Sequence, residues 1–293
     1  MALSKRGRIT LAAGLFLLPN LLGFLIFTSL PVAASLALSF FRWDLFTSPR
    51  FVGLHNFGVL MRDCDFWYYA FNTVFLMLMI PVNMLGSLLL ALVMNRKLRG
   101  IVAFRTIYFL PTIVAGVGTY VLWRWIYNPD YGLINAMLRA VGIQGPQWLQ
   151  SIAWAKPALM FMGFWTSVGG YNMILYLAAL QGVSPELYEA ADIDGANRWQ
   201  KFWAITWPLV SPTTFFIFTM SIIGGLQGGF EQAIVMTGGG PAGATTTIGY
   251  YIYNHAFAWN HMGYAAAIAW VLFAAVFVVT LLNWRFGGKV VHY

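Results

Sequence analysis

The sequence predicts an all-α, polytopic membrane protein with six transmembrane helices, and its composition and its long apolar runs support this fold class. Hydrophobic residues make up 60% of its 293 residues, charged residues make up 9%, and the mean hydropathy is +0.70. A soluble domain this apolar could not cover its surface, whereas lipid accepts such a surface if backbone polar groups are paired internally. The apolar runs are long and uncharged, which favours helices over the short alternating strands of a barrel.

Six apolar stretches predict one transmembrane domain over residues 1–293. The first is too long for the apolar core of a signal peptide, so we interpret it as a retained span. A short amphipathic helix is expected at residues 133–141, between the third and fourth spans. The predicted spans cover about residues 11–41, 71–94, 104–127, 157–180, 209–226 and 265–284.

The distribution of charge predicts the orientation in the membrane. Most of the 17 basic residues fall before the first span, in a turn at residues 95–100, within residues 184–208 or after the last span. The positive-inside rule therefore places both termini and residues 184–208 in the cytoplasm. The net charge of +8 is then explained as an insertion signal, which argues against a nucleic-acid partner.

The sequence offers no catalytic or metal-binding constellation. Cys64 is the single cysteine, and the four histidines lack paired ligand spacing, so we expect neither a metal site nor an intramembrane enzyme. A Gly-x-x-x-x-Gly-Lys-Ser/Thr phosphate loop is absent, so ATP hydrolysis would need a partner. A transporter that depends on a partner ATPase has one competing class, a gradient-driven secondary carrier for a small polar solute. Such carriers place ionisable groups in mid-membrane, and the predicted spans contain very few.

Residues 184–208 form the longest polar stretch and carry four of the nine acidic residues. Ser184 and Pro185 suit the N-cap and the first position of a short helix. Gly195 can leave that helix with a positive φ. A second helical piece is expected at about residues 196–206, with an aromatic stripe at helical spacing, and Pro208 suits a kink at the start of the next span.

These residues resemble a known family. The spacing of a Glu-Ala-Ala triplet, a glycine, an isoleucine and a proline is similar to the signature loop of binding-protein-dependent ABC importer permeases, and Trp207 departs from the usual leucine. Residues 179–181 and 192–196 look like the carbohydrate branch of that family. The matching positions are Glu189, Ala190, Ala191, Gly195, Ile205 and Pro208.

The resemblance implies that residues 184–208 are a coupling helix seated in a groove of a cytoplasmic ATPase; the alternative is an ordinary polar loop. Glu189 and Asp192 would make the charged contacts, and Gly195 would provide the bend. The implied partners are a second homologous permease, an ABC ATPase dimer that holds ATP and Mg, and an extracytoplasmic solute-binding protein. The chain would move a sugar or sugar derivative by alternating access across a bacterial or archaeal cytoplasmic membrane.

A polar and aromatic cluster in the fourth predicted span is the best candidate for substrate contacts. Sugar hydroxyls need hydrogen-bonding partners outside water, and sugar rings stack on aromatic faces. Small and hydroxyl residues also serve helix packing, which explains the cluster equally well. The resemblance favours a substrate role for at least one of Trp165, Tyr171 and Asn172, with Asn83 and Gln227 as weaker candidates.

The glycine-rich segment of residues 237–247 lies in a predicted outer loop. The resemblance implies that it forms an outer gate and a docking surface for the solute-binding protein. Its glycine content alone is equally typical of a flexible loop without a special role.

Overall fold

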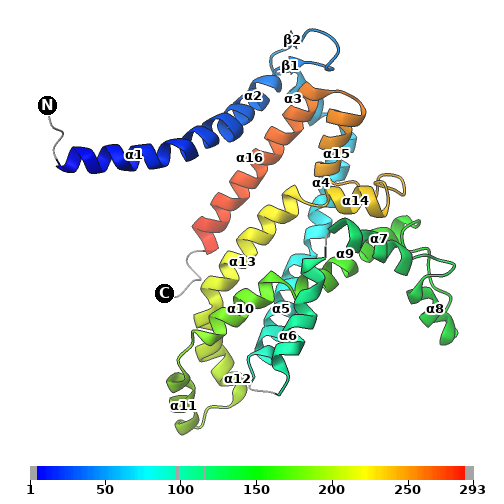
Figure 1. Cartoon of the computed structure of the whole chain (residues 1–293). Coiled ribbons are helices and arrows are strands. Elements are labelled where there is room, and N and C mark those ends of the chain that lie inside the picture. The colour runs from blue at the N-terminus through cyan, green and yellow to red at the C-terminus, as the bar shows by residue number, and fades with distance from the viewer. Residues whose placement is uncertain (1–4, 97–98, 115, 288–293) are drawn as a thin grey trace. The chain divides into compact units, whose positions relative to one another are not determined.

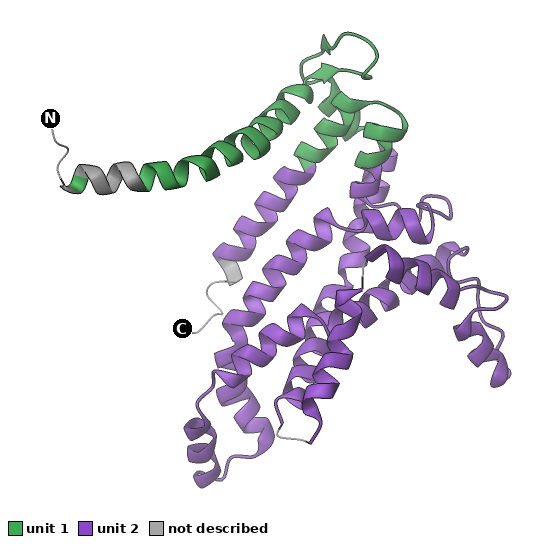
Figure 2. Ribbon diagram, in the orientation of Figure 1, with its two compact units in different colours: residues 1–63, 252–271 green, residues 64–251, 272–293 purple. Residues whose placement is uncertain are grey.

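The computed structural model describes residues 5–96, 99–114 and 116–287, and helices dominate the described residues (Figure 1). The chain forms two compact units, which Figure 2 distinguishes by colour. Unit 1 contains residues 1–63 and 252–271, and unit 2 contains residues 64–251 and 272–293. The predicted basic turn at residues 95–100 lies partly outside the described residues.

Four helical segments among the described residues are long and apolar enough to cross a membrane, which confirms the prediction of an apolar, mainly helical protein. A fifth candidate is the pair α6 (Ile101–Ile113) and α7 (Gly116–Ile126), whose directions differ by 96°. The fourth predicted span corresponds to two shorter helices, so the count of six spans stays a prediction. The four segments are Ala13–Leu38, Cys64–Met94, Arg198–Gln227 and Met262–Arg285.

Unit 1 is built from the N-terminal helices, a small hairpin and the start of the last helix. Asn56 fastens the hairpin to the end of the first span, because its side-chain amide donates to the carbonyls of Ser39 (2.8 Å) and Phe41 (2.9 Å). The backbone N–H of Met262 donates to the carbonyl of Trp43 at 3.0 Å. The elements are α1 (Lys5–Phe24), the π-helical turn η1 (Leu25–Ser29), α2 (Leu30–Leu38), β1 (Phe41–Arg42), β2 (Arg50–Phe51), α3 (His55–Met61), η3 (Asn254–Ala258) and the beginning of α16 (Met262–Gly287).

Unit 2 contains the remaining helices. The helix expected at residues 133–141 is present as α8 (Leu133–Ala140), and the second helical piece expected at residues 196–206 is present as α12 and η2. The elements are α4 (Cys64–Met77), α5 (Met79–Met94), α6, α7, α8, α9 (Ile152–Val168), α10 (Tyr171–Gln181), α11 (Pro185–Ile193), α12 (Arg198–Lys201), the π-helical turn η2 (Phe202–Thr206), α13 (Trp207–Gln227), α14 (Phe230–Met236) and α15 (Ile248–Tyr253), which extends into unit 1.

The main core of unit 2 lies where α10 packs between α5 and α13. Its largest fully buried side chains include Tyr176 and Met173 of α10 and Ile217 of α13. Helix α10 ends just before residues 184–208, and α13 begins within them. The chain on both sides of that segment is therefore held in one core.

A helix break at Gly169 and Gly170 separates α9 from α10 in the middle of the fourth predicted span. A Cβ atom at Gly169 would lie 2.2 Å from the backbone oxygen of Tyr108 on α6, a distance that no side chain tolerates. Glycine is therefore required for α6 to approach this break so closely.

Candidate functional site

The first half of the polar elbow, residues 184–208, is the short helix α11. Ser184 has extended backbone dihedral angles at the cap position, and Pro185 is the first helical residue, as predicted. The side chain of Ser184 makes no capping hydrogen bond. The start of the helix relies on Pro185, whose fixed φ suits the first turn, and on Glu186, whose negative charge favours a helix N-terminus.

Gly195 ends α11 as predicted, with a φ of +74°. The N–H of Ala196 donates to the carbonyl of Ala191 at 2.9 Å, and the N–H of Gly195 donates to the carbonyl of Asp192 at 3.1 Å. These two bonds form a Schellman motif, which requires a left-handed residue at the glycine position. A Cβ atom at Gly195 would meet no atom within 4 Å, so the backbone angle alone demands glycine here.

The second half of the elbow begins with a capping box that our sequence analysis missed. The Asn197 side-chain oxygen accepts from the N–H groups of Trp199 and Gln200, each at 3.0 Å. In return, the Gln200 side-chain oxygen accepts from the N–H of Asn197 at 2.8 Å. The Asn-x-x-Gln spacing at residues 197–200 carries this signal, because Asn is a strong N-cap residue and Gln at the third position completes the box.

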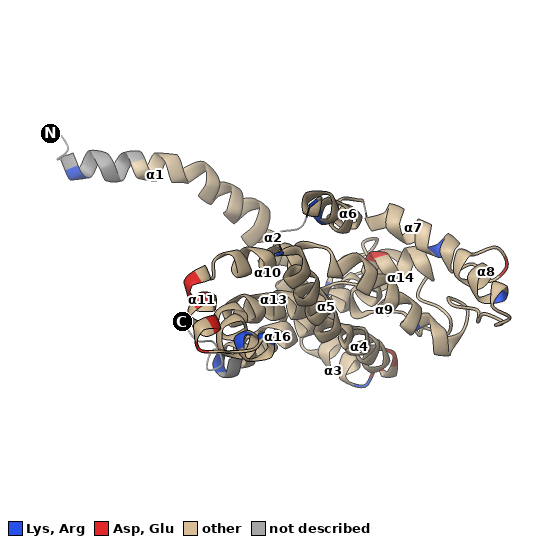
Figure 3. Cartoon of the chain, turned by 90° about the horizontal axis from the view of Figure 1, so that it is seen from below, with Lys and Arg blue, Asp and Glu red and all other residues tan. Residues whose placement is uncertain are grey.

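Two side-chain contacts tie the halves of the elbow together. Lys201 of α12 forms an ion pair with Asp192 of α11, and the hydroxyls of Tyr188 and Thr206 lie 2.8 Å apart. Figure 3 shows that acidic residues are concentrated on α11. Asp192 therefore has a partner within the chain, whereas Glu189 and Ala190 are exposed.

The elbow also exposes apolar side chains. Ile193 is 87% exposed and Trp199 is 69% exposed, and no covering element of the chain is described there. Trp199, Phe202, Trp203 and Trp207 contact one another in sequence, with ring centroids 5.2–6.4 Å apart. Ile205 and Pro208 are half-buried on the side of the elbow that continues into α13. A largely exposed isoleucine and tryptophan on one short segment are typical of a surface that a partner covers.

The three predicted substrate residues flank the break between α9 and α10: Trp165 precedes it, and the neighbours Tyr171 and Asn172 follow it. Trp165 of α9 packs edge-on against Trp123 of α7, with ring centroids 5.5 Å apart. Tyr171, the first residue of α10, packs edge-on against Phe109 of α6 at 5.6 Å. Asn172 is half-buried beside it. Of the weaker candidates, Gln227 is exposed, and Asn83 has a buried side-chain oxygen without a partner among the described residues.

Trp165 belongs to an extended row of aromatic rings, which we call the aromatic wall. The wall runs through α7, α9 and the loop between α8 and α9, and successive ring centroids lie 5.2–5.8 Å apart. Its Tyr127 hydroxyl donates to the carbonyl of Ala158 at 2.8 Å, which ties α7 to α9. The wall consists of Trp123, Tyr127, Trp148, Trp154, Phe161 and Trp165.

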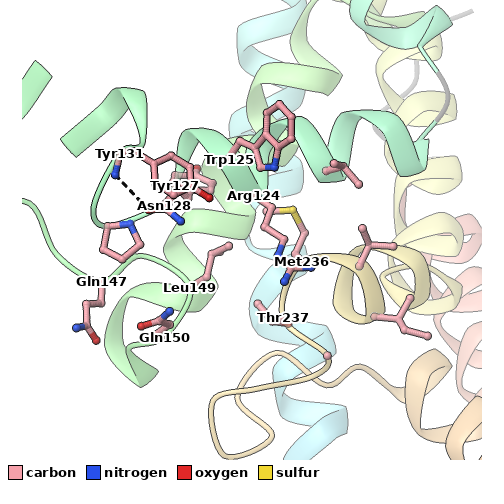
Figure 4. A pocket seen from close by; sticks show the side chains of 15 residues that line it. Arg124, Trp125, Tyr127, Asn128, Tyr131, Gln147, Leu149, Gln150, Met236 and Thr237 are labelled. Atoms are coloured by element: carbon pink, nitrogen blue, oxygen red, sulfur yellow. Dashed lines mark hydrogen bonds between the residues drawn. The ribbon is translucent and has the colours of Figure 1, made fainter. Parts of the chain in front are cut away.

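A cavity of about 660 Å³ adjoins the aromatic wall at Tyr127. Arg124 of α7 extends beside Met236 of α14 (Figure 4), and Gln147 and Gln150 of the loop between α8 and α9 also line the cavity. Amides, a guanidinium and aromatic rings are groups that hold polyhydroxyl ligands. Sequence reasoning missed this cavity because its lining comes from three separate segments.

The family comparison finds one model that matches nearly the whole chain. Residues 12–290 match the model of the binding-protein-dependent transport system inner membrane component. The chain is 35% identical to the probable ABC transporter permease protein YesP of Bacillus subtilis, over 97% of this chain and 92% of that protein. It is 34% identical to the sn-glycerol-3-phosphate transport system permease protein UgpA of Agrobacterium fabrum, over 95% of each. It is 33% identical to the multiple sugar-binding transport system permease protein MsmF of Streptococcus mutans, over 94% of each.

Solved structures show the same fold. A bacterial ABC transporter involved in the import of the acidic polysaccharide alginate matches with a TM-score of 0.85 and 28% identity, over 97% of this chain and 96% of that chain. A second structure of the bacterial alginate ABC transporter, in complex with the alginate pentasaccharide-bound periplasmic protein, matches with the same TM-score and 27% identity, over 98% and 96%.

Proposed function

This chain belongs to the family of inner membrane components of binding-protein-dependent transport systems, and from this membership we propose that it carries a sugar or sugar derivative through the membrane within an ABC importer. The observation that carries the proposal is the match of sugar-transport permeases over nearly the whole length of both chains. The chain is a permease subunit and not an enzyme, because the family consists of transporter permeases. The same membership favours an importer over a gradient-driven carrier.

We propose that residues 1–293 form one transmembrane domain with six spans and cytoplasmic termini. The bent pair of α6 and α7 would supply one span, and α9 with α10 would supply another. Half-helices that meet at a break can line a passage, because the freed backbone groups turn toward a polar cavity. Trp165, Tyr171 and Asn172 flank such a break, which supports their proposed role as substrate contacts.

We propose that the elbow is the coupling helix that docks on a cytoplasmic ATPase. The Schellman motif, the capping box and the Asp192–Lys201 pair join its two halves, so a push on α11 is passed to η2 and α13. The exposed Ile193 and Trp199 would be covered by the ATPase. Glu189 would make the charged contact, and Ala190, Ala191, Ile205 and Pro208 would shape the surface. ATP and Mg would be bound by the ATPase and not by this chain.

We propose three further features of the complete importer. A second homologous permease would complete the passage, and an extracytoplasmic solute-binding protein would deliver the sugar. Closure of the ATPase dimer would move the elbow, and α10 and α13 would follow because they pack in one core. The passage would then exchange its opening between the two sides of the membrane.

Affinity purification from the native membrane in mild detergent tests the assembly. We expect the tagged chain to bring an ABC ATPase and a second permease, which mass spectrometry identifies. Proteoliposomes with this complex and its binding protein should take up labelled sugar only when ATP is present on the side of the membrane that carries the ATPase. A chain that elutes alone and transports without ATP would establish the gradient-driven carrier.

Site-specific cross-linking tests the coupling role. A cysteine at Glu189 should cross-link to the ATPase in membranes of a Cys64→Ser background, because the elbow is proposed to sit in a groove of that protein. Asp130→Cys is the matched control, since it lies in the loop before α8 and should not react with the ATPase. Equal cross-linking at both positions would contradict the coupling assignment.

A further inference from the structure

Unit 1 contains two arginines that face each other across its small hairpin. Strands β1 and β2 pair antiparallel, and the register places Arg42 directly opposite Arg50. Like charges at directly opposite positions destabilise a strand pair. Neither arginine has an acidic partner, because the ion pair found among the described residues joins Lys201 and Asp192. The hairpin therefore holds two arginines at opposite positions, and neither forms an ion pair among the described residues.

The one polar contact seen for these arginines leaves their charge intact. Arg42 Nη2 lies 3.2 Å from His55 Nε2. A guanidinium can only donate hydrogen bonds, so this imidazole nitrogen is the acceptor and His55 is neutral in the contact. Arg50 is exposed at the end of the loop between the strands.

Both arginines line a cavity of about 700 Å³ in unit 1, and one carboxylate shares this lining. Oδ1 of Asp44 accepts from the N–H groups of Phe46 (3.1 Å) and Thr47 (2.8 Å) and from the Thr47 hydroxyl (2.7 Å). These bonds engage Asp44 in its own turn, and they lower its pKa, chiefly through the Thr47 backbone, so it stays ionised. The two guanidinium groups still outnumber this carboxylate, and the cavity favours a single negative charge over a doubly charged phosphate.

Large apolar side chains stand exposed on the same hairpin. Phe46 is 83% exposed, and Phe51, which follows Arg50, is 72% exposed. Exposed aromatic rings around arginines are the composition of protein interfaces, where both residue types are enriched. This composition favours a protein partner as the source of the anion.

We propose that this cavity receives a carboxylate side chain of the extracytoplasmic solute-binding protein, held by Arg42 and Arg50 when that protein docks. The inference rests on the proposed function, which supplies the binding protein and, because the N-terminus is proposed to be cytoplasmic, places the hairpin after the first span on the outer side. Guanidinium groups bind carboxylates in a planar, two-point geometry, and the fixed register of the hairpin presents both at once. This contact is separate from the glycine-rich loop of residues 237–247.

A binding measurement on the complete importer tests this site. The importer is held in nanodiscs of phosphatidylcholine, and the probe is the solute-binding protein that co-purifies with it. We expect Arg42→Glu and Arg50→Glu each to weaken binding by about tenfold or more, because each reversal places a second carboxylate in the cavity. Arg62→Glu is the matched control: this exposed arginine at the end of α3 does not line the cavity, and its binding should stay within about twofold. Unchanged ATPase activity of the importer alone, without the binding protein, would show that the variants assemble.

A charge exchange identifies the partner residue. Acidic surface residues of the binding protein are replaced by arginine one at a time, and one replacement should restore binding to the Arg50→Glu importer while weakening binding to the unmodified importer. Wild-type affinity in both arginine variants, or an equal loss in Arg62→Glu, would overturn the proposal. An effect of added phosphatidylglycerol that requires these arginines, with no change in the affinity for the binding protein, would also overturn the proposal. It would assign the cavity to a lipid phosphate. If the tagged chain brings no ATPase, the proposed function fails, and this inference fails with it.

Discussion

The elbow and the aromatic wall belong to the same unit, but different kinds of contact stabilise them. Hydrogen bonds and an ion pair with defined donors and acceptors join the two halves of the elbow, in addition to the ring contacts along its second half. The wall consists mainly of ring packing, with one hydrogen bond from Tyr127. Hydrogen bonds weaken steeply away from their preferred angle, while ring contacts in the wall have interplanar angles from 39° to 78°. Under the proposed function, the directional contacts between the halves of the elbow are suited to transmit a movement, and the ring packing of the wall is suited to adapt to a ligand.

The largest effect is expected at Gly195. Gly195→Val should abolish uptake while leaving membrane insertion intact, because a β-branched residue resists the φ of +74° that the Schellman motif requires. Uptake in proteoliposomes and the amount of protein in the membrane fraction are the two measurements. Gly195→Asn is the matched control and should keep most of the activity, since asparagine tolerates this conformation and open space surrounds the site. Normal uptake by the valine variant would show that the bend is dispensable.

A smaller effect is expected from the ion pair that joins the halves of the elbow. Asp192→Lys should lower the sugar transported per ATP hydrolysed by about fivefold, with little loss of stability, because exposed pairs contribute only about 0–1 kcal/mol. The double exchange of Asp192→Lys with Lys201→Asp should restore coupling if the pair acts within the chain. If Asp192 instead contacts the ATPase, the double exchange will stay as defective as the single variant. The family resemblance implied that second role, so this experiment distinguishes the two.

Substitutions in the aromatic wall should change the apparent affinity for sugar and not the coupling of transport to ATP hydrolysis. Trp165→Ala should raise the half-saturating sugar concentration by about fivefold, which corresponds to the loss of about 1 kcal/mol of aromatic contact. Transport per ATP should stay unchanged, because the elbow is untouched. Trp165→Phe keeps a ring against Trp123 and serves as the control. An equal fall in coupling in the alanine variant would contradict the division of roles between the elbow and the wall.

The elbow was largely predictable from the sequence, because its contacts join residues close together in the chain. The positions of Ser184 and Pro185 and the bend at Gly195 follow from local preferences, and the capping box at Asn197 was equally readable. The break at Gly169 was not predictable, because it depends on the approach of the distant Tyr108. The pairing of Arg42 with Arg50 likewise required the register of two strands. Apolar composition indicates a span but does not reveal where distant helices interrupt it.

His255 in unit 1 has both a polar contact and ring packing. Its titration is expected to produce the smallest of the predicted effects. The imidazole is buried against the rings of Trp259 and Tyr264, and its Nδ1 lies 3.4 Å from Nδ1 of His261. Burial, with a smaller contribution from His261 and against an opposing one from Asp63, lowers the pKa of His255 to about 4.

Between this pKa of about 4 and the unfolded value of 6.5, the unfolded chain binds a proton that the folded chain does not. The contribution of His255 to stability is therefore fully present above the unfolded pKa and is lost as the pH falls toward the folded pKa. We expect amide exchange in residues 252–264 to accelerate from about pH 7.5 to about pH 5, after correction for intrinsic exchange. His255→Phe keeps a ring in the same place without a titrating group, so it should remove this pH dependence. A persistent acceleration in that variant would assign the effect to another group, and ring packing alone would then account for the stability of this segment.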